Sequence, residues 1–559
     1  MNRGQARRLQ QGRGESCRAQ VGNQLSIEFG TGRDSRRLDS LRARSAQQGH
    51  AVHAGHASID QQQRWRFRVQ YPQRGVRVRD GQHGAAAAFD CRAKKAAADG
   101  VVIGNQDKWL GCYHSEFLCR DVPETCCMTV MDADIVDLSH DGRGVARIEG
   151  KAVFVSGALP GERVRLRFSG KHRHYDEAIV EEILKPSADR VTPRCAHFGI
   201  CNGCALQHLA PAAQIAAKQH VLLENFERIG KVRPQQLLPA LTDEPWGYRR
   251  KARLGVKFVD KKGRVLVGFR ESNGRYIADI KRCEILHPAV GGQIEALASL
   301  IESLEAKRTI PQIEIAAGDD LVALIFRHLH PLSAADEQAL REFGQRHGLG
   351  IYLQPGGIDS VASLWPPDAR LSFRLPAYDL DIEFRPLDFI QVNGGMNLRM
   401  IDHALQLLDA KPGNRVLDLF CGLGNFTLPI ARRGADVVGV EGEAGLVRRA
   451  EENALRNRVD NARFYAADLA ADQRRAPWAT IDHDLLLLDP PRSGAAEVLE
   501  YLPGRGVKRV VYVSCHPGSL ARDAGILVER HGFELRTAGV MDMFPHTAHV
   551  ESIALFERK

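Results

Sequence analysis

The hydrophobic pattern of the chain becomes regular at Met131. From Met131 to Leu184, apolar and polar residues alternate in short runs, interrupted by glycine-containing turns such as Asp141-Gly142. Alternation with a period of two predicts β-strands, because successive side chains of a strand point to opposite faces. The runs predict short strands at about 132–138, 143–148, 151–156, 162–168 and 175–184. Many short strands in a small segment are typical of an OB-like β-barrel.

Longer elements follow this barrel. The pattern predicts helices at about 211–230 and 291–307 and strands near 310–316 and 321–327, which is an α+β arrangement. From about residue 386 to Lys559, apolar strands alternate with helices in a βαβ rhythm that indicates a Rossmann-like domain. The chain is therefore predicted to be a multidomain α/β protein.

Residues 1–127 differ in composition from the rest. They show no sustained period of 2 or 3.6, and they hold 21 Lys and Arg against 12 Asp and Glu, the whole formal net charge of +9. We interpret them as disordered or as an upstream extension from a misassigned start codon, since Met128 and Met131 precede the patterned sequence; a basic nucleic-acid-binding arm is the alternative. The predicted domains are this extension (1–127), the barrel (128–190), a central domain (191–385) and the Rossmann-like domain (386–559).

The overall composition fits a soluble globular protein, with 44% hydrophobic and 26% charged residues. We find no apolar run of 18 residues and no apolar core of a secretory signal near the N-terminus, so no membrane partner is predicted. A cytoplasmic location follows as the default prediction. In that compartment, cysteines serve metals or catalysis more often than disulfides.

Three cysteines lie close together in the central domain. Cys195, Cys201 and Cys204 have C-x5-C-x2-C spacing with small, turn-forming residues between them, and Cys283 is the nearest candidate for a fourth ligand. Four thiolates suit Zn²⁺ or an iron–sulfur cluster, and the spacing leaves both open. The alternative is a group of cysteines without a metal, which would be prone to oxidation.

A concentrated positive segment runs from Tyr248 to Arg282, with 12 Lys and Arg against 3 Asp and Glu. The alternation in RRKARLGVKFV predicts a strand that presents charge on one face. Aromatic residues suited to stacking on bases are interleaved: Tyr248, Phe258, Phe269 and Tyr276. With a second basic cluster in the barrel, Lys171–Tyr175, the segment predicts RNA binding, and an ordinary solvated face is the alternative.

The strongest local signal is VLDLFCGLGNFT, Val416–Thr427, an apolar strand followed by a Gly-x-Gly turn and a helix start. Glycines let the backbone approach a ligand closely. The next strand ends at Glu441, whose carboxylate suits ribose hydroxyls. The absence of G-x-G-x-x-G favours S-adenosyl-L-methionine over a dinucleotide. Acids at two further strand ends, Asp468 and Asp489, complete the predicted site, with helix capping as their alternative role.

Cys515 follows the apolar strand Arg509–Val513, at a position where open α/β sheets build their sites. Pro517 ends the extended run, and a helix is predicted to begin near Ser519. From this context, Cys515 is either a small core residue or a nucleophile. A helix start is expected to lower the pKa of such a thiol.

Five motifs occur in order toward the C-terminus: FIQVN, LDLFCGLGNFT, DPPRSG, VYVSCHPGSLARD and MFPHTAHVES. Together they resemble the RNA (uracil-5)-methyltransferase family, over about residues 131–559. The resemblance implies that the barrel is a TRAM domain and that a [4Fe-4S] cluster is bound by Cys195, Cys201, Cys204 and Cys283. It implies S-adenosyl-L-methionine binding by Gln391, Phe420, Asn425, Glu441, Asp468 and Asp489. Asp468 stands where a close relative has an asparagine, so this position keeps acceptors and loses donors.

The family chemistry assigns roles to Cys515 and Glu551. Uracil C5 is a poor nucleophile, and addition of a thiolate at C6 forms an enolate that makes C5 nucleophilic. Cys515 matches the nucleophile, and Glu551 in HTAHVES matches the base that removes the C5 proton. Cys421, which follows Phe420, is interpreted as a packing residue.

The barrel and the four cysteines resemble the branch of the family that methylates U1939 of bacterial 23S ribosomal RNA, since the tRNA branch generally lacks both. The predicted partner is therefore 23S ribosomal RNA, and the protein is expected to be a monomer without an obligate protein partner. The alternatives are the same chemistry on another 23S uridine or on a tRNA uridine, and a non-catalytic iron–sulfur RNA-binding factor. Cytosine-5 methylation is disfavoured because the order is Cys515-His516-Pro517 and the Pro-Cys motif is absent.

Overall fold

The computed structural model describes residues 130–272, 274–501 and 506–558, together with four short strands nearer the N-terminus. These strands form two antiparallel pairs, β1 (Cys17–Val21) with β2 (Leu25–Phe29) and β3 (Phe67–Gln70) with β4 (Gly75–Val78). The chain divides into two compact units, Met1–Thr129 and Val130–Lys559. Apart from the four strands, the extension predicted over residues 1–127 lies outside the described residues. Every helix among the described residues is too short or too polar to cross a bilayer.

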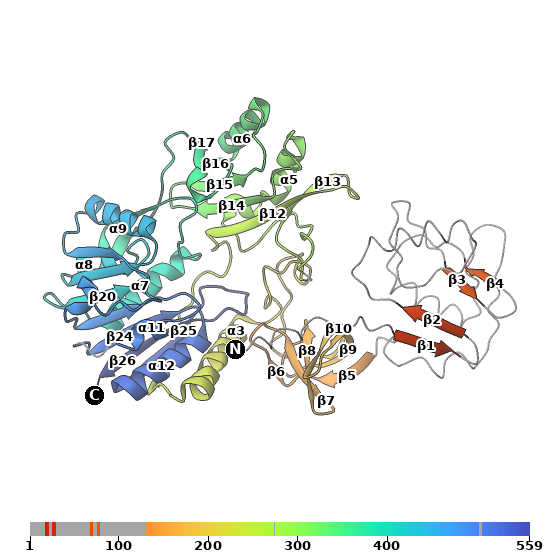
Figure 1. The fold of residues 1–559 in the computed structure, drawn as a ribbon, viewed down its shortest axis with the longest axis horizontal. Coiled ribbons are helices and arrows are strands. Elements are labelled where there is room, and N and C mark those ends of the chain that lie inside the picture. The colour runs from red at the N-terminus through yellow and green to blue at the C-terminus, as the bar shows by residue number, and fades with distance from the viewer. Residues whose placement is uncertain are drawn as a thin grey trace, which may run out of the picture. The chain divides into compact units, whose positions relative to one another are not determined.

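The second unit begins with a small β-domain, drawn in orange in Figure 1. Its strands are β5 (Val130–Asp134), β6 (Asp137–Leu138), β7 (Gly144–Ile148), β8 (Lys151–Ser156), β9 (Arg163–Lys171) and β10 (Tyr175–Lys185). Their order is β5-β9-β10-β8-β7-β6, and β8 pairs parallel with β10 in an otherwise antiparallel sheet. β5 and β6 are adjacent in sequence yet lie at opposite ends of this order, so the sheet curls until its two edges approach each other.

Four of the predicted strands are confirmed as β7 to β10, with small differences at their ends. The single strand predicted over 132–138 is wrong, because the chain breaks at Ile135 and passes from one edge of the sheet to the other. The Ile135 N–H donates to the Glu162 carbonyl and the Val136 N–H donates to the Val145 carbonyl, both at 2.9 Å. Ile135 itself turns inward and is 2% exposed in the core of the domain.

A six-stranded sheet forms the middle of the unit (green in Figure 1), in the order β13-β12-β14-β15-β16-β17. The strands are β12 (Lys251–Val259), β13 (Arg264–Gly268), β14 (Gln312–Ala317), β15 (Val322–Arg327), β16 (Leu349–Gln354) and β17 (Ala362–Trp365). The accompanying helices are α4 (Pro288–Gly291), α5 (Ile294–Ser303) and α6 (Ala334–His347). The two strands predicted near 310–316 and 321–327 are confirmed as β14 and β15, whereas the helix predicted over 291–307 is shorter. The hairpin β18 (Leu371–Leu375) and β19 (Leu380–Phe384) leads to the last part of the chain.

The C-terminal part alternates strands and helices, as predicted (cyan to blue in Figure 1). Its strands are β20 (Arg415–Leu419), β21 (Asp436–Glu441), β22 (Ala462–Ala466), β23 (Leu485–Leu488), β24 (Arg509–Ser514), β25 (Phe533–Met541) and β26 (Glu551–Arg558). Its helices are α7 (Gly394–Leu408), α8 (Thr427–Arg432), α9 (Ala444–Arg456), α10 (Pro477–Thr480), α11 (Ala496–Leu499) and α12 (Pro517–His531).

These strands form one sheet with the order β11-β25-β26-β24-β23-β20-β21-β22. β20 to β24 are parallel, and β26 lies antiparallel between β24 and β25. β20 has β21 on one side and β23 on the other, so the strand order reverses at β20. In open α/β sheets, ligands bind beyond the carboxyl ends of the strands at such a point.

Helix α3 (Pro211–Asn225) and the π-helical turn Phe226–Gly230 pack on this C-terminal sheet, and together they confirm the helix predicted over 211–230. A Cβ atom at Gly230 would lie 2.3 Å from the Ala521 carbonyl oxygen on α12, so only glycine allows this close approach. The edge strand β11 (Gln236–Leu237) then pairs parallel with β25. Residues from the middle of the chain thus complete the sheet that carries the predicted site.

Candidate active site

Cys515 and Glu551 come from neighbouring strands of the C-terminal sheet. β24 ends at Ser514 and β26 begins at Glu551, and the antiparallel register pairs Ser514 with Ser552. The Ser552 hydroxyl donates a hydrogen bond to the Ser514 carbonyl at 3.2 Å. In antiparallel strands, the residue after one partner lies opposite the residue before the other. The register therefore brings Cys515 beside Glu551.

The electrostatic environment of Cys515 favours the neutral thiol. Burial raises the pKa of Cys515 to about 11, and the nearby carboxyl groups of Glu551 and Asp489 add to the effect, while Arg492 opposes it. The lowering of this pKa expected from a helix start is therefore wrong. Loss of hydration and the neighbouring acids outweigh the lowering by Arg492 and by a backbone hydrogen bond.

Helix α12 begins at Pro517, two residues earlier than the predicted Ser519. His516 caps it, because its Nδ1 accepts the Ser519 N–H at 3.1 Å. Burial is the main cause that lowers the pKa of His516, in keeping with a neutral ring that accepts this bond. The cap ends the strand sharply and leaves Cys515 between strand and helix.

Both carboxyl groups near Cys515 also have raised pKa values. Glu551 is 3% exposed, and burial raises its pKa well above the usual value, with Asp489 adding and Arg492 opposing. Burial raises the pKa of Asp489 to about 7. Shifted acids beside a thiol are typical of a functional site. Once ionised, a carboxylate with a raised pKa is the stronger proton acceptor.

Further side chains approach this centre from other segments. Gln391 Nε2 lies 3.5 Å from Asp489 Oδ2. Arg492 Nη2 lies 3.0 Å from His549 Nδ1, which links the segment after β23 to the loop before β26. Arg492 and His549 lie inside the motifs DPPRSG and MFPHTAHVES, but neither residue was predicted to belong to the site.

The loop after β20 forms a cradle where the strand order reverses. Phe420 has a left-handed backbone (φ 64°), which is uncommon outside glycine, and its N–H donates to the Val440 carbonyl at 2.8 Å. A Cβ atom on Gly422 would meet no atom within 4 Å, so open space lies above the loop. Glu441 Oε2 accepts the Gly422 N–H and its Oε1 accepts the Glu443 N–H, both at 3.1 Å, so each oxygen keeps one further lone pair for a ligand.

The remaining predicted cofactor residues lie in different settings. Asn425 exchanges two hydrogen bonds with Asn397 of α7, at 3.0 and 2.9 Å, which fastens the loop to that helix. Asp468 is exposed, and its Oδ1 accepts the Ala470 N–H at 3.0 Å, a local turn contact; no helix begins here, so the alternative role as a helix cap is wrong. Asp418 was not predicted; it is fully buried, accepts a 2.5 Å hydrogen bond from Thr427, and burial raises its pKa to about 7.

The four predicted cluster ligands line one small cavity. Cys195, Cys201, Cys204 and Cys283 surround it together with apolar side chains such as Phe269. Burial raises the pKa of Cys204 to about 12 and that of Cys283 to about 11, and the other cysteines add to both shifts. Over the part of the chain that the structure describes, no group of three or more Cys, His, Asp or Glu side chains is arranged to hold a metal ion.

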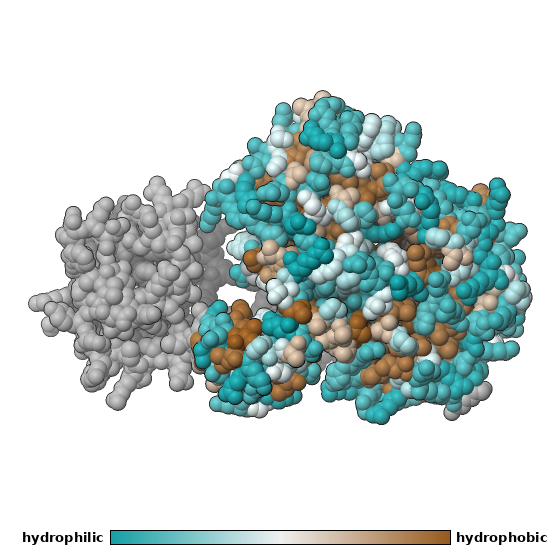
Figure 2. Space-filling view, turned by 180° about the vertical axis from the view of Figure 1, so that it is seen from behind, coloured by the Kyte–Doolittle hydropathy of each residue, from teal (hydrophilic) through white to brown (hydrophobic). Residues whose placement is uncertain are grey.

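The basic segment presents its charges as predicted, but its aromatic residues differ from one another. Along β12, Arg253 and Lys257 are exposed and alternate with buried apolar residues. Tyr248 is only 7% exposed, and its hydroxyl donates to the Pro545 carbonyl, so the prediction that it stacks on bases is wrong. Tyr276 is 65% exposed. Figure 2 shows one face of the molecule, where hydrophilic residues surround scattered apolar areas.

Two segments of the chain match known protein-family models. Residues 371–559 match the family model of tRNA (Uracil-5-)-methyltransferase, and residues 125–169 match that of the TRAM domain. The 23S rRNA (uracil(1939)-C(5))-methyltransferase RlmD of Xanthomonas oryzae pv. oryzae is 62% identical over 434 residues, 77% of this chain and 98% of that protein. The chain belongs to the RlmD family. The RlmD protein of Xylella fastidiosa is 60% identical over 433 residues, again 77% of this chain and 98% of that protein.

A solved structure supports the same fold. The Pyrococcus abyssi tRNA (uracil-54, C5)-methyltransferase, in complex with S-adenosyl-L-homocysteine, matches with a TM-score of 0.60 and 23% identity, covering 76% of this chain and 100% of that chain. Together with the two family models, this likeness confirms the predicted TRAM domain and the C-terminal S-adenosylmethionine-dependent methyltransferase fold. The comparisons also confirm the family resemblance inferred from the five motifs.

Proposed function

We propose that this protein transfers a methyl group from S-adenosyl-L-methionine to C5 of U1939 in 23S ribosomal RNA. Membership of the RlmD family supports the reaction and its substrate, and the methyltransferase fold supports the methyl donor. Cys515 follows Ser514 and Glu551 precedes Ser552 in the paired strands β24 and β26, and their resulting proximity is the observation that carries the chemistry. It joins a nucleophile and a base at the carboxyl end of the sheet.

Cys515 performs the first step. Its thiolate adds to C6 of the target uracil, and the electrons of the C5–C6 double bond move toward O4, which makes C5 nucleophilic. When bound, S-adenosyl-L-methionine supplies the methyl group that C5 takes, together with a positive charge. A nearby positive charge lowers a thiol pKa, so cofactor binding offsets part of the burial that holds the pKa of Cys515 at about 11.

Glu551 performs the last step. After methylation, C5 carries both the methyl group and its original proton. The Glu551 carboxylate takes that proton, the C5–C6 double bond forms again, and the C6–S bond breaks to release the Cys515 thiolate. The buried position of Glu551, 3% exposed, suits a base that acts on a proton sealed from water.

The residues of the cradle fit S-adenosyl-L-methionine. The open space above Gly422 admits a ligand against the backbone, and Glu441 retains lone pairs for ribose hydroxyls. We assign cofactor binding to Gln391, Phe420, Asn425, Glu441, Asp468 and Asp489. Among them, Asp468 would have to exchange its contact with Ala470 for one with the ligand.

We assign a [4Fe-4S] cluster to Cys195, Cys201, Cys204 and Cys283; that all four thiols line the same cavity supports this proposal. Four thiols line one cavity, and the Gly203 N–H lies 3.4 Å from Cys201 Sγ, a contact of the kind that stabilises iron–sulfur sulfurs. When bound, the cluster would tie the loop at Cys195–Cys204 to Cys283 and serve structure or RNA positioning. Thiolate ligation requires that the raised pKa values of these thiols fall on metal binding.

RNA binding is assigned to the OB-like TRAM domain (128–190) and to the exposed charges of the central domain (191–385). Two exposed aromatic side chains offer stacking surfaces, Tyr276 (65% exposed) and Phe389 of FIQVN (70% exposed). The target uridine must leave its stack to reach Cys515. A monomeric state without an obligate protein partner remains a prediction.

Mass mapping of methylated uridines tests the proposed function. The full chain, purified anaerobically, is incubated with isotopically labelled S-adenosyl-L-methionine and either unmodified 23S ribosomal RNA or tRNA. We expect one methylated uridine, U1939, because the chain shares 62% identity with an RlmD protein. Methylation of tRNA alone would keep the chemistry and overturn the substrate. No methylation, with RNA still bound, would favour the non-catalytic RNA-binding factor.

Removal of one cluster ligand is expected to release the metal. In the Cys204→Ser variant, iron content should fall from about four atoms per chain to a small fraction, with loss of the visible absorbance of the cluster. Elemental analysis and spectroscopy of anaerobic samples measure both. Cys421→Ser is the matched control, because Cys421 is buried (4% exposed) away from the cysteine cavity and should keep the iron. Stoichiometric zinc in the wild-type protein would contradict the assignment.

A further inference from the structure

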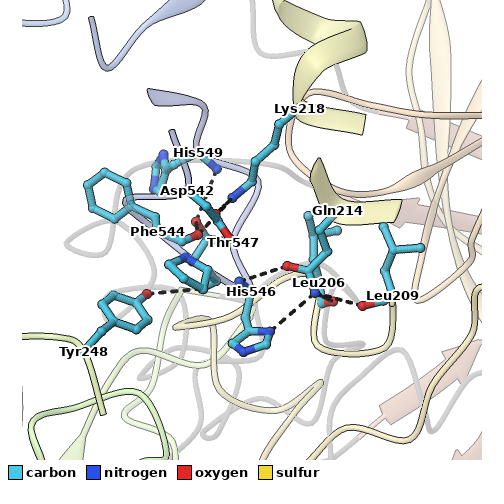
Figure 3. Close-up of polar contacts among 11 residues, drawn as sticks. Leu206, Leu209, Gln214, Lys218, Tyr248, Asp542, Phe544, His546, Thr547 and His549 are labelled. Carbon is cyan, nitrogen blue, oxygen red and sulfur yellow. Dashed lines mark hydrogen bonds and ion pairs between the residues drawn. The ribbon is translucent and has the colours of Figure 1, made fainter. Parts of the chain in front are cut away.

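The loop between β25 and β26, residues 542–550, directly precedes Glu551 in the chain, and we call it the base loop (Figure 3). Within it, His546 has a left-handed backbone with φ 66°, a conformation that non-glycine residues rarely adopt. Strained backbone persists where the surroundings hold it in place. Because the base loop ends directly before Glu551, the contacts that hold the loop also help to fix the position of Glu551.

Gln214 of α3 makes several of these contacts (Figure 3). Its side chain is buried, and its Oε1 accepts the His546 N–H at 3.0 Å. Its Nε2 donates to the carbonyls of Leu206 at 3.0 Å and Leu209 at 2.8 Å. One amide thus joins α3, the segment that follows Cys204, and the base loop.

Lys218 lies one turn further along α3 and points to the start of the base loop. Its Nζ donates to Asp542 Oδ1 at 2.6 Å and to the Phe544 carbonyl at 3.0 Å, and the residue is 2% exposed. Replacing a buried ion pair by well-packed apolar groups is often neutral or stabilising, so we attribute the presence of Lys218 to the directional contacts it makes. Its neighbours Ala216 and Ala217 have no side-chain polar groups to make such contacts.

The segment after Cys204 also binds the base loop directly. The His546 carbonyl accepts two hydrogen bonds, from the Ala205 N–H and the Leu206 N–H, both at 2.9 Å. The Trp246 ring stacks on the His546 ring with 3.9 Å between centroids. The base loop is therefore held between α3 and the cysteine-bearing segment.

We propose that Gln214 and Lys218 are positioning residues for Glu551. They fix the conformation of the base loop, and through it they hold the carboxyl group beside Cys515. The inference rests on the proposed role of Glu551 as the base. It assigns a function to two polar residues of α3 that belong to no motif of the family resemblance.

The positioning role can be tested through the step that depends on Glu551, the removal of the C5 proton that releases the covalent adduct. If the base is displaced, the C5 proton leaves slowly and the covalent adduct between Cys515 and RNA persists. In the full chain, Lys218→Met and Gln214→Leu should each slow adduct resolution by about 10- to 100-fold, since small displacements of a catalytic group have effects of this size. The adduct is measured as an RNA-linked band in a denaturing gel, and RNA affinity should stay unchanged. Lys218→Arg, which keeps the charge and donors, should restore much of the rate.

A matched control separates positioning from stability. Leu222→Ala removes packing on the same helix, where Leu222 is fully buried in the apolar core, and it should lower the melting temperature without accumulation of the adduct. Resolution at the wild-type rate in folded Lys218→Met overturns the proposal; if that variant does not fold, the same readout on Gln214→Leu decides. Failure of Glu551→Gln itself to accumulate the adduct would instead refute the proposed role of Glu551. Accumulation in Glu551→Gln alone would refute only the positioning role.

Discussion

Replacing Cys515 with alanine is expected to lower the rate of uridine methylation by at least about ten-thousand-fold. Without the thiolate, no bond forms at C6, and C5 keeps the low nucleophilicity of an unactivated uracil. Effects of this size follow the removal of a catalytic nucleophile in other enzymes. Single-turnover transfer of a labelled methyl group to 23S ribosomal RNA measures the rate directly.

The same variant should bind both ligands normally. Cys515 lies between β24 and α12, and alanine removes one sulfur atom without changing the backbone or the His516 cap. Equilibrium binding of RNA and of S-adenosyl-L-methionine, with the melting temperature, provides the control. Cys515→Ser gives a second comparison, because a hydroxyl in the same position is a much weaker nucleophile. Turnover within tenfold of wild type in either variant would exclude covalent catalysis through Cys515.

Much of the fold could be predicted because its signals are local. Alternation between polar and apolar residues identified β7 to β10, and the apolar runs of the βαβ region identified the parallel sheet. The break at Ile135 could not be read in this way, since it depends on which edge strand each side of the break joins. Likewise, nothing local shows that Gln236–Leu237 becomes an edge strand beside β25.

In the candidate site too, the residues within local motifs could be predicted, whereas the features that depend on the folded structure could not. Motifs identified Cys515 and Glu551, but their proximity depends on the register of β24 with β26, which is a property of the folded sheet. The helix start after Cys515 suggested a lowered thiol pKa, and burial reverses that direction. Gln214 and Lys218 read as ordinary polar positions of a helix, because their burial comes from a loop more than three hundred residues away in the chain.

Replacing Glu551 with glutamine is expected to trap the reaction after methylation. The amide keeps the size of the side chain but cannot take the C5 proton, so the covalent adduct should accumulate while net turnover falls by about 10²- to 10⁴-fold. Adduct formation by Cys515 should remain, which distinguishes this variant from Cys515→Ala. A denaturing gel with labelled RNA and a parallel assay for labelled methyl groups in the trapped band measure both effects.

The environment of Glu551 makes this variant a sharp test. Burial raises the pKa of Glu551 well above its usual value, so the folded protein favours a neutral group at this position. Glutamine is neutral at every pH, and the substitution should therefore preserve the melting temperature or raise it slightly. A loss of turnover in a stable variant then reports on chemistry and not on folding. Normal turnover, without a trapped adduct, would assign the proton transfer to another group, and the raised pKa of Asp489 at about 7 would make that residue the next candidate.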